Sequence, residues 1–327
     1  MNDAKKQDTY RAVKKGAVKE EIMKIDDVIT GNNIEKSFGG FKLDIPELHI
    51  PKGFATALIG ENGAGKTTLL NILTGLRLDA AGDVTYFGKY TGVESDPYVK
   101  NAIGYTGSGT YYLPHWTVDQ VCEITSLLFE SFDRDKFDKI ADAIALDKTG
   151  KMGASKKVSE LSDGNKVKLM LCGALARKTD ILIMDEPASP LDPLMRDTLC
   201  DLIREYISNG QGERSVFFST HNVADMESVT DYAMIMEQGK IVEQGFVEEL
   251  KEKYVIVKGN SEDTAKARSI LYSISESSYG FSGVCLSKDL DKFVGMNIQT
   301  ERAGLTEICV AVMKSHSKLK LTGSIEI

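Results

Sequence analysis

The segment G-E-N-G-A-G-K-T-T at residues 60–68 constrains the fold of this chain more than any other feature. The apolar run before it, residues 54–59, is typical of a buried strand, and residues 69–75 after it have helical spacing and end in glycine. Glycines let successive backbone N–H groups point at a phosphate chain, and a helix start adds its positive dipole end. This order of elements favours a phosphate-binding loop over a chance glycine-rich turn. The predicted loop residues are Gly60, Glu61, Asn62, Gly63, Ala64, Gly65, Lys66, Thr67 and Thr68.

Polar residues in and beyond this loop have side chains that can bind phosphate and Mg²⁺ and activate a water molecule. Lys66 is expected to reach the β- and γ-phosphates of a nucleotide, and Thr67 to place its hydroxyl on Mg²⁺. Asp185 and Glu186 follow the apolar run at residues 181–184. The aspartate can hold Mg²⁺ through water, and the glutamate can act as a general base on an attacking water. Without the phosphate loop, the same carboxylates would be interpreted as an acidic turn after a core strand.

Two further residues can be interpreted either as functional or as purely structural. His221 follows the apolar strand at residues 216–218 and can hydrogen-bond a γ-phosphate, although a lone histidine at a strand end is normally a surface residue. Residues 161–165, L-S-D-G-N, open a helix. Ser162 is therefore either a simple N-cap or part of a second anion-binding helix start.

Composition and charge limit the class of protein. The chain has 327 residues, 42% of them hydrophobic and 27% charged, so it can bury a large core. Its net charge of −8 argues against nucleic acid as a partner. No apolar run is long enough to span a bilayer, and the first residues lack a signal-peptide core. We therefore expect a cytoplasmic chain, and the five scattered cysteines are expected to be reduced.

The order of strand-like and helical segments predicts an α/β fold. Residues 1–28 are rich in charge and are expected to form a tail. Residues 29–252 alternate between strands and helices, which predicts a P-loop NTPase core with a parallel sheet. A helical subdomain at about residues 100–177 interrupts this core, with helices expected at residues 118–129, 137–146 and 162–177. Residues 253–327 form a small α+β region, with a helix expected at residues 261–273.

These motifs, in this order, resemble the ATP-binding subunit of ABC transporters over about residues 30–250. Residues 60–68 match the Walker A loop, Asp185 closes Walker B, and Glu186 matches the catalytic glutamate. His221 matches the switch histidine. Residues 161–165 match the signature that is usually written L-S-G-G-Q.

The resemblance implies roles for further residues. Phe38 stands where the family places an aromatic ring against adenine, and residues 189–192, S-P-L-D, match the D-loop. In this family the signature of one chain contacts the ATP held by the other. Ser162 and Gly164 are thereby implied to bind nucleotide across a dimer.

The chain departs from the family pattern at three positions. Ser108 stands where the family has Gln or Glu, so contact with Mg²⁺ and coupling to a permease are expected to differ. Asp163 replaces a small or basic residue, which places a carboxylate near the partner's ATP at an electrostatic cost that Lys166 can offset. Pro190 replaces the D-loop glycine and stiffens the turn. We expect an active ATPase that is slow or dependent on its partner.

The resemblance implies a complete functional assignment. The chain would bind ATP and Mg²⁺ and hydrolyse ATP as a homodimer or with a paired ABC ATPase subunit. Closure of the dimer would power a separate transmembrane permease of the ABC-2 type, which places the chain on the inner face of the membrane, with a docking groove near Tyr111 and Trp116. The alternatives are a soluble ABC ATPase outside transport and a nucleotide-sensing module with little hydrolysis.

Overall fold

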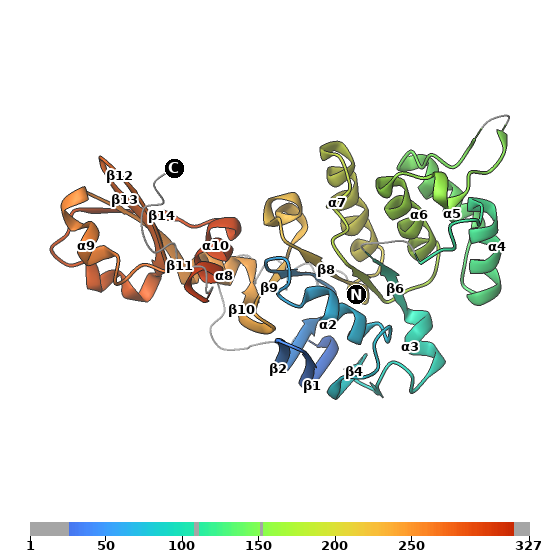
Figure 1. The fold of residues 1–327 in the computed structure, drawn as a ribbon, viewed down its shortest axis with the longest axis horizontal. Coiled ribbons are helices and arrows are strands. Elements are labelled where there is room, and N and C mark those ends of the chain that lie inside the picture. The colour runs from blue at the N-terminus through green and yellow to red at the C-terminus, as the bar shows by residue number, and fades with distance from the viewer. Residues whose placement is uncertain (1–25, 108–110, 151–152, 317–327) are drawn as a thin grey trace.

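The structure is a computed structural model that describes residues 26–107, 111–150 and 153–316 (Figure 1). Residues 1–25 of the expected tail lie outside this range, and the first strand begins at Asp27. Ser108, one of the three departures from the family pattern, also lies outside the described residues. Within them, no helix is long and apolar enough to cross a membrane.

A six-stranded, mostly parallel sheet forms the centre of the molecule (Figure 1). Its strand order is β10-β9-β3-β8-β7-β6, and only β10 pairs antiparallel, with β9. The strands are β3 (Ala55–Ile59), β6 (Ile103–Thr106), β7 (Ile181–Met184), β8 (Ser215–Thr220), β9 (Tyr232–Glu237) and β10 (Lys240–Phe246). Because parallel strands need crossovers, helices cover both faces of the sheet. This arrangement confirms the predicted α/β fold with a parallel sheet.

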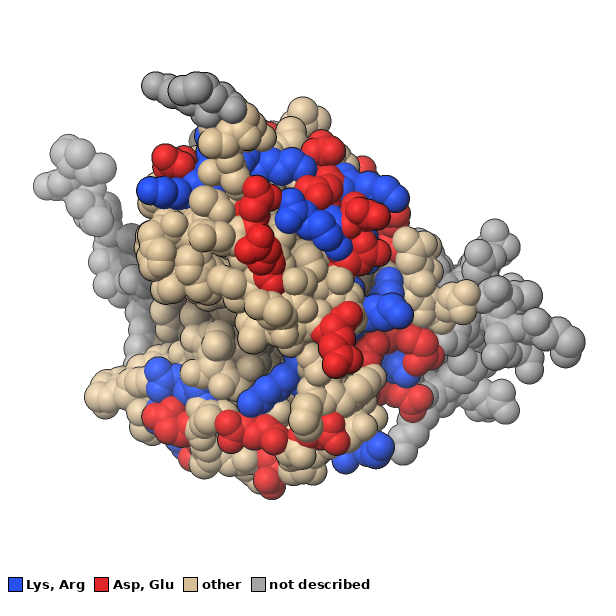
Figure 2. Space-filling view, turned by 90° about the vertical axis from the view of Figure 1, so that its right-hand side faces the viewer, with Lys and Arg blue, Asp and Glu red and all other residues tan. Residues whose placement is uncertain are grey.

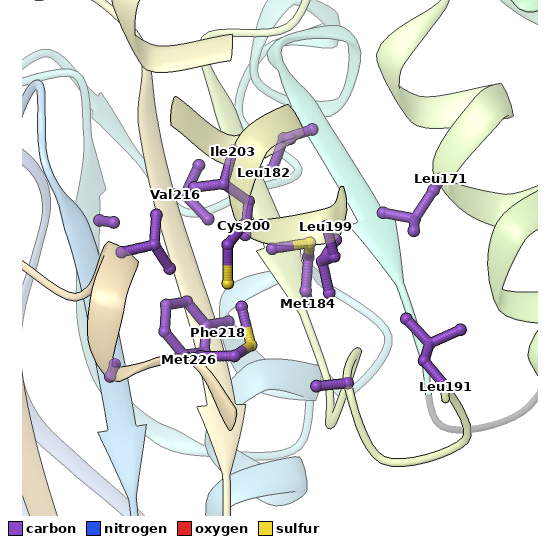
Figure 3. Close-up of a cluster of buried hydrophobic side chains, with 14 of the residues drawn as sticks. Leu171, Leu182, Met184, Leu191, Leu199, Cys200, Ile203, Val216, Phe218 and Met226 are labelled. Atoms are coloured by element: carbon purple, nitrogen blue, oxygen red, sulfur yellow. The ribbon is translucent and has the colours of Figure 1, made fainter. Parts of the chain in front are cut away.

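Both faces of this sheet are buried, so its strands are apolar throughout rather than alternating. In β7, Leu182 and Met184 pack into one hydrophobic cluster, and Ile181 and Ile183 pack into another on the opposite face. The first cluster joins the sheet to α6 (Asp163–Leu175) and α7 (Pro193–Ser208). Figure 3 shows part of it, with side chains from β7, β8 and α7 meeting around Phe218.

The second cluster holds the helix that follows the phosphate loop, α2 (Lys66–Leu73). An antiparallel sheet of order β2-β1-β4-β5 packs into the same cluster. Its strands are β1 (Asp27–Phe38), β2 (Phe41–Pro51), β4 (Ala81–Tyr86) and β5 (Tyr90–Thr91). Helix α2 is thus held between two sheets, which fixes the loop at its N-terminus.

The predicted helical subdomain is present between β6 and β7. Its helices are α4 (Val118–Leu128), α5 (Arg134–Ala143) and α6, and α3 (Pro97–Ala102) precedes β6. Helix α5 begins earlier than expected because Asp133 accepts a hydrogen bond from the Lys136 N–H at 2.9 Å and caps it. A capping box between Thr117 and Gln120 begins α4.

The C-terminal region forms a third, antiparallel sheet of order β12-β13-β11-β14, on the left in Figure 1. Its elements are β11 (Tyr254–Gly259), α9 (Thr264–Ala267), β12 (Ser273–Ser277), β13 (Gly280–Leu286) and β14 (Ile298–Arg302). This order and connectivity are those of the split β-α-β motif of ferredoxin-like folds. The helix expected at residues 261–273 is shorter, because Ile270 and Leu271 leave it to pack beneath the sheet.

Two helices connect this region to the central core. Helix α8 (Val247–Lys253) leads from β10 into β11, and α10 (Leu305–His316) returns to the core after β14. Leu305, Ile308 and Val312 of α10 are buried in the same cluster as the central sheet. The last described helix therefore packs against both the central sheet and the C-terminal accessory sheet that precedes it in sequence.

Candidate functional site

The phosphate loop lies at the carboxyl end of a fully buried strand. All of β3 is buried, and the chain leaves the sheet directly into the loop. Gly65 has a φ of 110°, and a Cβ added to it would lie 2.8 Å from the Phe41 ring, so only glycine fits here. Because Gly65 provides no side-chain cap, the first N–H groups of α2 are available to an anionic ligand.

Lys66 lies across this loop and is almost completely buried, with 6% exposure. Its Nζ donates to the carbonyl oxygens of Gly60 at 2.7 Å and of Glu61 at 3.2 Å. The same nitrogen lies 3.2 Å from Oε1 of Glu186. The structure therefore brings a loop cation and a strand-end carboxylate together from positions far apart in sequence.

Asp185 is buried at the end of β7, with 1% exposure. Its Oδ2 accepts the hydroxyl proton of Thr67 at 2.9 Å, and its Oδ1 accepts that of Ser219 at 2.6 Å. A carboxylate and a hydroxyl in direct contact form the oxygen donor set that Mg²⁺ prefers. The residues predicted for metal binding thus fit that ion.

Glu186 adopts a φ of +50°, in the left-handed region that is unfavourable for residues with a Cβ. Its Oε2 lies 2.7 Å from Nδ1 of His221. Its backbone N–H donates to the Ser219 hydroxyl at 2.9 Å. Lys66, Glu186 and His221 therefore form one contiguous cluster of charged and titratable groups.

Ser219 is a functional candidate that the sequence reasoning missed. The available signal was its place near the end of an apolar strand, just before His221. The serine is fully buried, and only the pairing of β8 with β7 places it beside Asp185.

Two aromatic residues lie near the loop. Phe38 lies at the end of β1 and is partly buried, with the Arg77 guanidinium 4.9 Å from its ring centroid. Phe41, which was not predicted, contacts the loop at Gly65 and lines a cavity of about 550 Å³. The same cavity is lined by loop residues Glu61, Asn62, Gly63 and Ala64.

The signature segment lies at the start of α6, where Ser162 is the N-cap. Its Oγ accepts hydrogen bonds from the N–H of Asn165 at 3.3 Å and from the Asn165 side chain at 3.0 Å. The expected compensation of Asp163 is present as an ion pair of 2.9 Å with Lys166. Among the described residues, no hydrogen bond or ion pair joins Ser162 or Gly164 to residues 60–68. One chain does not bring its own signature to its own loop.

A second cavity, of about 660 Å³, extends from Thr67 and Asp185 toward the helical subdomain. Its lining is rich in aromatic side chains, among them Tyr105, Tyr111, Trp116 and Phe129. Tyr111 is 53% exposed, whereas Trp116 is partly buried and packs on the core. Burial, followed by the charge of Asp185, raises the pKa of Tyr105 to about 12. That phenol therefore stays protonated at neutral pH.

These features together define an ATP-binding cassette. The site combines a glycine-rich loop at a helix start, two carboxylates at a strand end and a histidine after the next strand. It lies on a parallel sheet that is interrupted by a helical subdomain. The profile of the ABC transporter family matches residues 43–189. The tungstate uptake system ATP-binding protein TupC of Peptoclostridium acidaminophilum is 31% identical over 234 residues, which are 66% of this chain and 97% of that protein. The chain belongs to the ATP-binding proteins of ABC transporters.

Solved structures support the same fold. An ATP-binding subunit of an ABC transporter superimposes with a TM-score of 0.58 at 20% identity, over 68% of this chain and 92% of that one. A dimeric ATP-binding cassette in a post-hydrolysis state with ADP and Pi superimposes with a TM-score of 0.56 at 19% identity, over 67% and 98%. With the family assignment, the protein is an ABC-type ATPase subunit that binds ATP and energises transport.

Proposed function

We propose that Lys66, Thr67, Asp185, Glu186 and His221 form a Mg²⁺-dependent ATP hydrolysis site. The main support for this proposal is that these side chains contact one another in the structure. Thr67 contacts Asp185, and Glu186 contacts both Lys66 and His221. The variants of Glu186 and Lys66 described in the Discussion test it.

Each side chain has a distinct task in this site. Lys66 binds the phosphate chain, and the free N–H groups of α2 add to that attraction. Thr67 and Asp185 would hold Mg²⁺, which when bound neutralises the negative charge of the phosphates. Glu186 accepts a proton from the attacking water at its carboxylate, and His221 keeps that carboxylate oriented. In the structure the Lys66 ammonium forms an ion pair with Glu186. The phosphates of a bound nucleotide would therefore compete with the Glu186 carboxylate for Lys66.

The site is completed by a second cassette in a head-to-tail pair. Ser162 and Gly164 do not contact their own phosphate loop, and they lie at an open helix start on the helical subdomain. Gly164 also approaches the D-loop, since a Cβ added to it would lie 3.0 Å from the carbonyl oxygen of Pro190. The signature and D-loop therefore form one surface that faces the ATP of the partner, and Phe38 stacks on adenine from the loop side.

Ser162→Arg is expected to block ATP-dependent pairing while ATP affinity of the single chain changes less than about twofold. A bulky cation at the partner-facing helix start prevents close approach, whereas the loop of the same chain is untouched. Light scattering in the Glu186→Gln background would report pairing, and a fluorescent nucleotide would report affinity.

A second N-cap variant controls for lost helix capping. Thr117→Arg removes the equivalent cap of α4 and should cost a similar ~1 kcal/mol of stability, with pairing retained. Equal loss of pairing in both variants, or equal loss of pairing and nucleotide binding in Ser162→Arg, would show that Ser162 is only a cap.

We further propose that a separate transmembrane permease of the ABC-2 type binds at the aromatic cavity beside the helical subdomain. Leu128 and Tyr111 line this cavity and are exposed, and Leu127 of α4 is exposed beside Leu128. Figure 2 shows acidic and basic side chains intermingled on the side of the molecule that carries α4, with a hollow of mainly uncharged residues below them. Such a mixed surface suits a protein partner rather than nucleic acid, and binding there places the chain on the inner face of the membrane.

The double variant Tyr111→Ala and Trp116→Ala is expected to leave the membrane fraction when the chain is co-expressed with the membrane subunit of its transporter. Loss of two aromatic anchors typically costs about 2 kcal/mol or more each, which is about 30-fold or more per anchor in affinity. ATP binding should be unchanged. Tyr279→Ala, which removes a 92% exposed tyrosine from the turn between β12 and β13, is the control. Retention of the double variant on the membrane would place the docking surface elsewhere.

A further inference from the structure

Ser219 is a buried polar residue that contacts both carboxylate residues of the proposed mechanism. It is the penultimate residue of β8 and is 0% exposed. Its Oγ lies 2.6 Å from Oδ1 of Asp185 and 2.9 Å from the backbone nitrogen of Glu186. Because an N–H can only donate, the serine oxygen accepts from Glu186, and its own proton is donated to Asp185.

This hydroxyl fixes the orientation of the Asp185 carboxylate. Thr67 donates to one carboxylate oxygen and Ser219 to the other. Two donors on opposite oxygens define the plane of the group, and a buried carboxylate needs both of them because water does not reach it. Without Ser219, Oδ1 would lose its donor and the carboxylate would be free to turn about the bond that carries it.

The same hydroxyl supports the unusual backbone of Glu186. The left-handed φ of +50° at this residue persists only where surrounding contacts hold it. The Ser219 hydroxyl accepts a hydrogen bond from the N–H of this strained residue. The backbone so held directs the Glu186 carboxylate toward Lys66 and His221.

We propose that Ser219 is a positioning residue of the ATPase, whose hydroxyl orients the metal-binding carboxylate and the general base at once. It is fully buried and acts only through Asp185 and Glu186. The proposal rests on the roles proposed above for those two residues. It predicts an effect on turnover and on Mg²⁺ requirement rather than on nucleotide affinity.

Ser219→Ala is expected to lower kcat by about 10- to 100-fold, with the KM for ATP changed by less than about threefold. The half-saturating Mg²⁺ concentration at fixed ATP should rise by about tenfold, as it does when the hydrogen-bond partner of a metal ligand is removed. Ser219→Thr keeps a hydroxyl on the same carbon, and it should recover much of the lost turnover. Phosphate release on the full chain would measure all three.

Ser215 offers a matched control on the same strand. It is also 0% exposed, and its Oγ accepts the N–H of Gly53 at 2.9 Å, remote from both carboxylates. Ser215→Ala should lose as much thermal stability as Ser219→Ala while keeping kcat and the Mg²⁺ requirement within about twofold of the wild type. The pair therefore separates a positioning role from a loss of stability.

The outcomes are distinct. Wild-type kcat and Mg²⁺ requirement in Ser219→Ala, or equal losses in Ser215→Ala, would overturn the positioning role. Glu186→Gln, measured in parallel, tests the proposed hydrolysis site separately from the positioning role of Ser219. If Glu186→Gln is inactive while Ser219→Ala is fully active, only the positioning role fails. If Glu186→Gln hydrolyses ATP like the wild type, the proposed hydrolysis site fails instead.

Discussion

Glu186→Gln is expected to bind ATP with wild-type affinity and to hydrolyse it at least about 100-fold more slowly. The amide has nearly the shape of the carboxylate but cannot take a proton from water. Its backbone N–H still donates to Ser219, so the fold of the site should persist. Phosphate release would measure the rate, and a fluorescent nucleotide would measure the affinity.

The same variant should accumulate an ATP-dependent dimer, because a pair that closes on ATP reopens only after hydrolysis. Light scattering with and without ATP would detect it. Glu237→Gln is a suitable control, since Glu237 is another buried carboxylate at a strand end of the same sheet, and its kcat should stay within about twofold. Wild-type turnover in Glu186→Gln would remove this residue as the general base. A strictly monomeric variant at saturating ATP, with its membrane partner present, would count against the shared site.

Lys66→Ala is expected to lower kcat/KM by more than about 100-fold, with weaker binding of ATP as well as slower turnover. The buried ammonium donates to two loop carbonyls and lies 3.2 Å from Oε1 of Glu186. Without it, Glu186 faces the incoming phosphates uncompensated, and like charges in a desolvated site repel strongly. Binding and hydrolysis should therefore fail together, unlike in Glu186→Gln.

Lys42→Ala provides the control for this result. Lys42 lines the cavity beside the loop but is half exposed and pairs with Glu35 at 3.1 Å. Its removal should change ATP affinity by less than about threefold, because an exposed ion pair contributes little. Near-normal ATP affinity in folded Lys66→Ala, confirmed by thermal unfolding, would contradict the assignment of the loop.

The phosphate loop was predictable because its signals are local. A buried apolar strand, glycines and a helix start follow one another in residues 54–75, and the structure has β3, the loop and α2 there. The helices of the helical subdomain were predictable for the same reason, since Thr117 and Ser162 cap them with their own following residues. The predicted start of α5 was wrong, because Asp133 caps the helix and begins it at Arg134 instead of residue 137.

Other features were not predictable from local patterns. Phe41 contacts Gly65 because the β1–β2 hairpin packs over α2, and nothing in the sequence near Phe41 indicates that contact. Helix α10 follows the accessory sheet in sequence, yet it packs into the central core. The shortened helix α9 likewise depends on the sheet that Ile270 and Leu271 cover.

The sequence by itself determined most of the elements, the loop and the chemical identity of Lys66, Asp185, Glu186 and His221, because local backbone preference and apolar patterning are encoded by neighbouring residues. The tertiary structure alone decided which of these groups meet. Thr67 contacts Asp185, and Ser219 contacts Asp185 and Glu186, only because β3, β8 and β7 lie side by side in parallel register. Parallel strands bring their carboxyl ends to one edge of a sheet, and the strand order that does so is set by packing between segments distant in the chain.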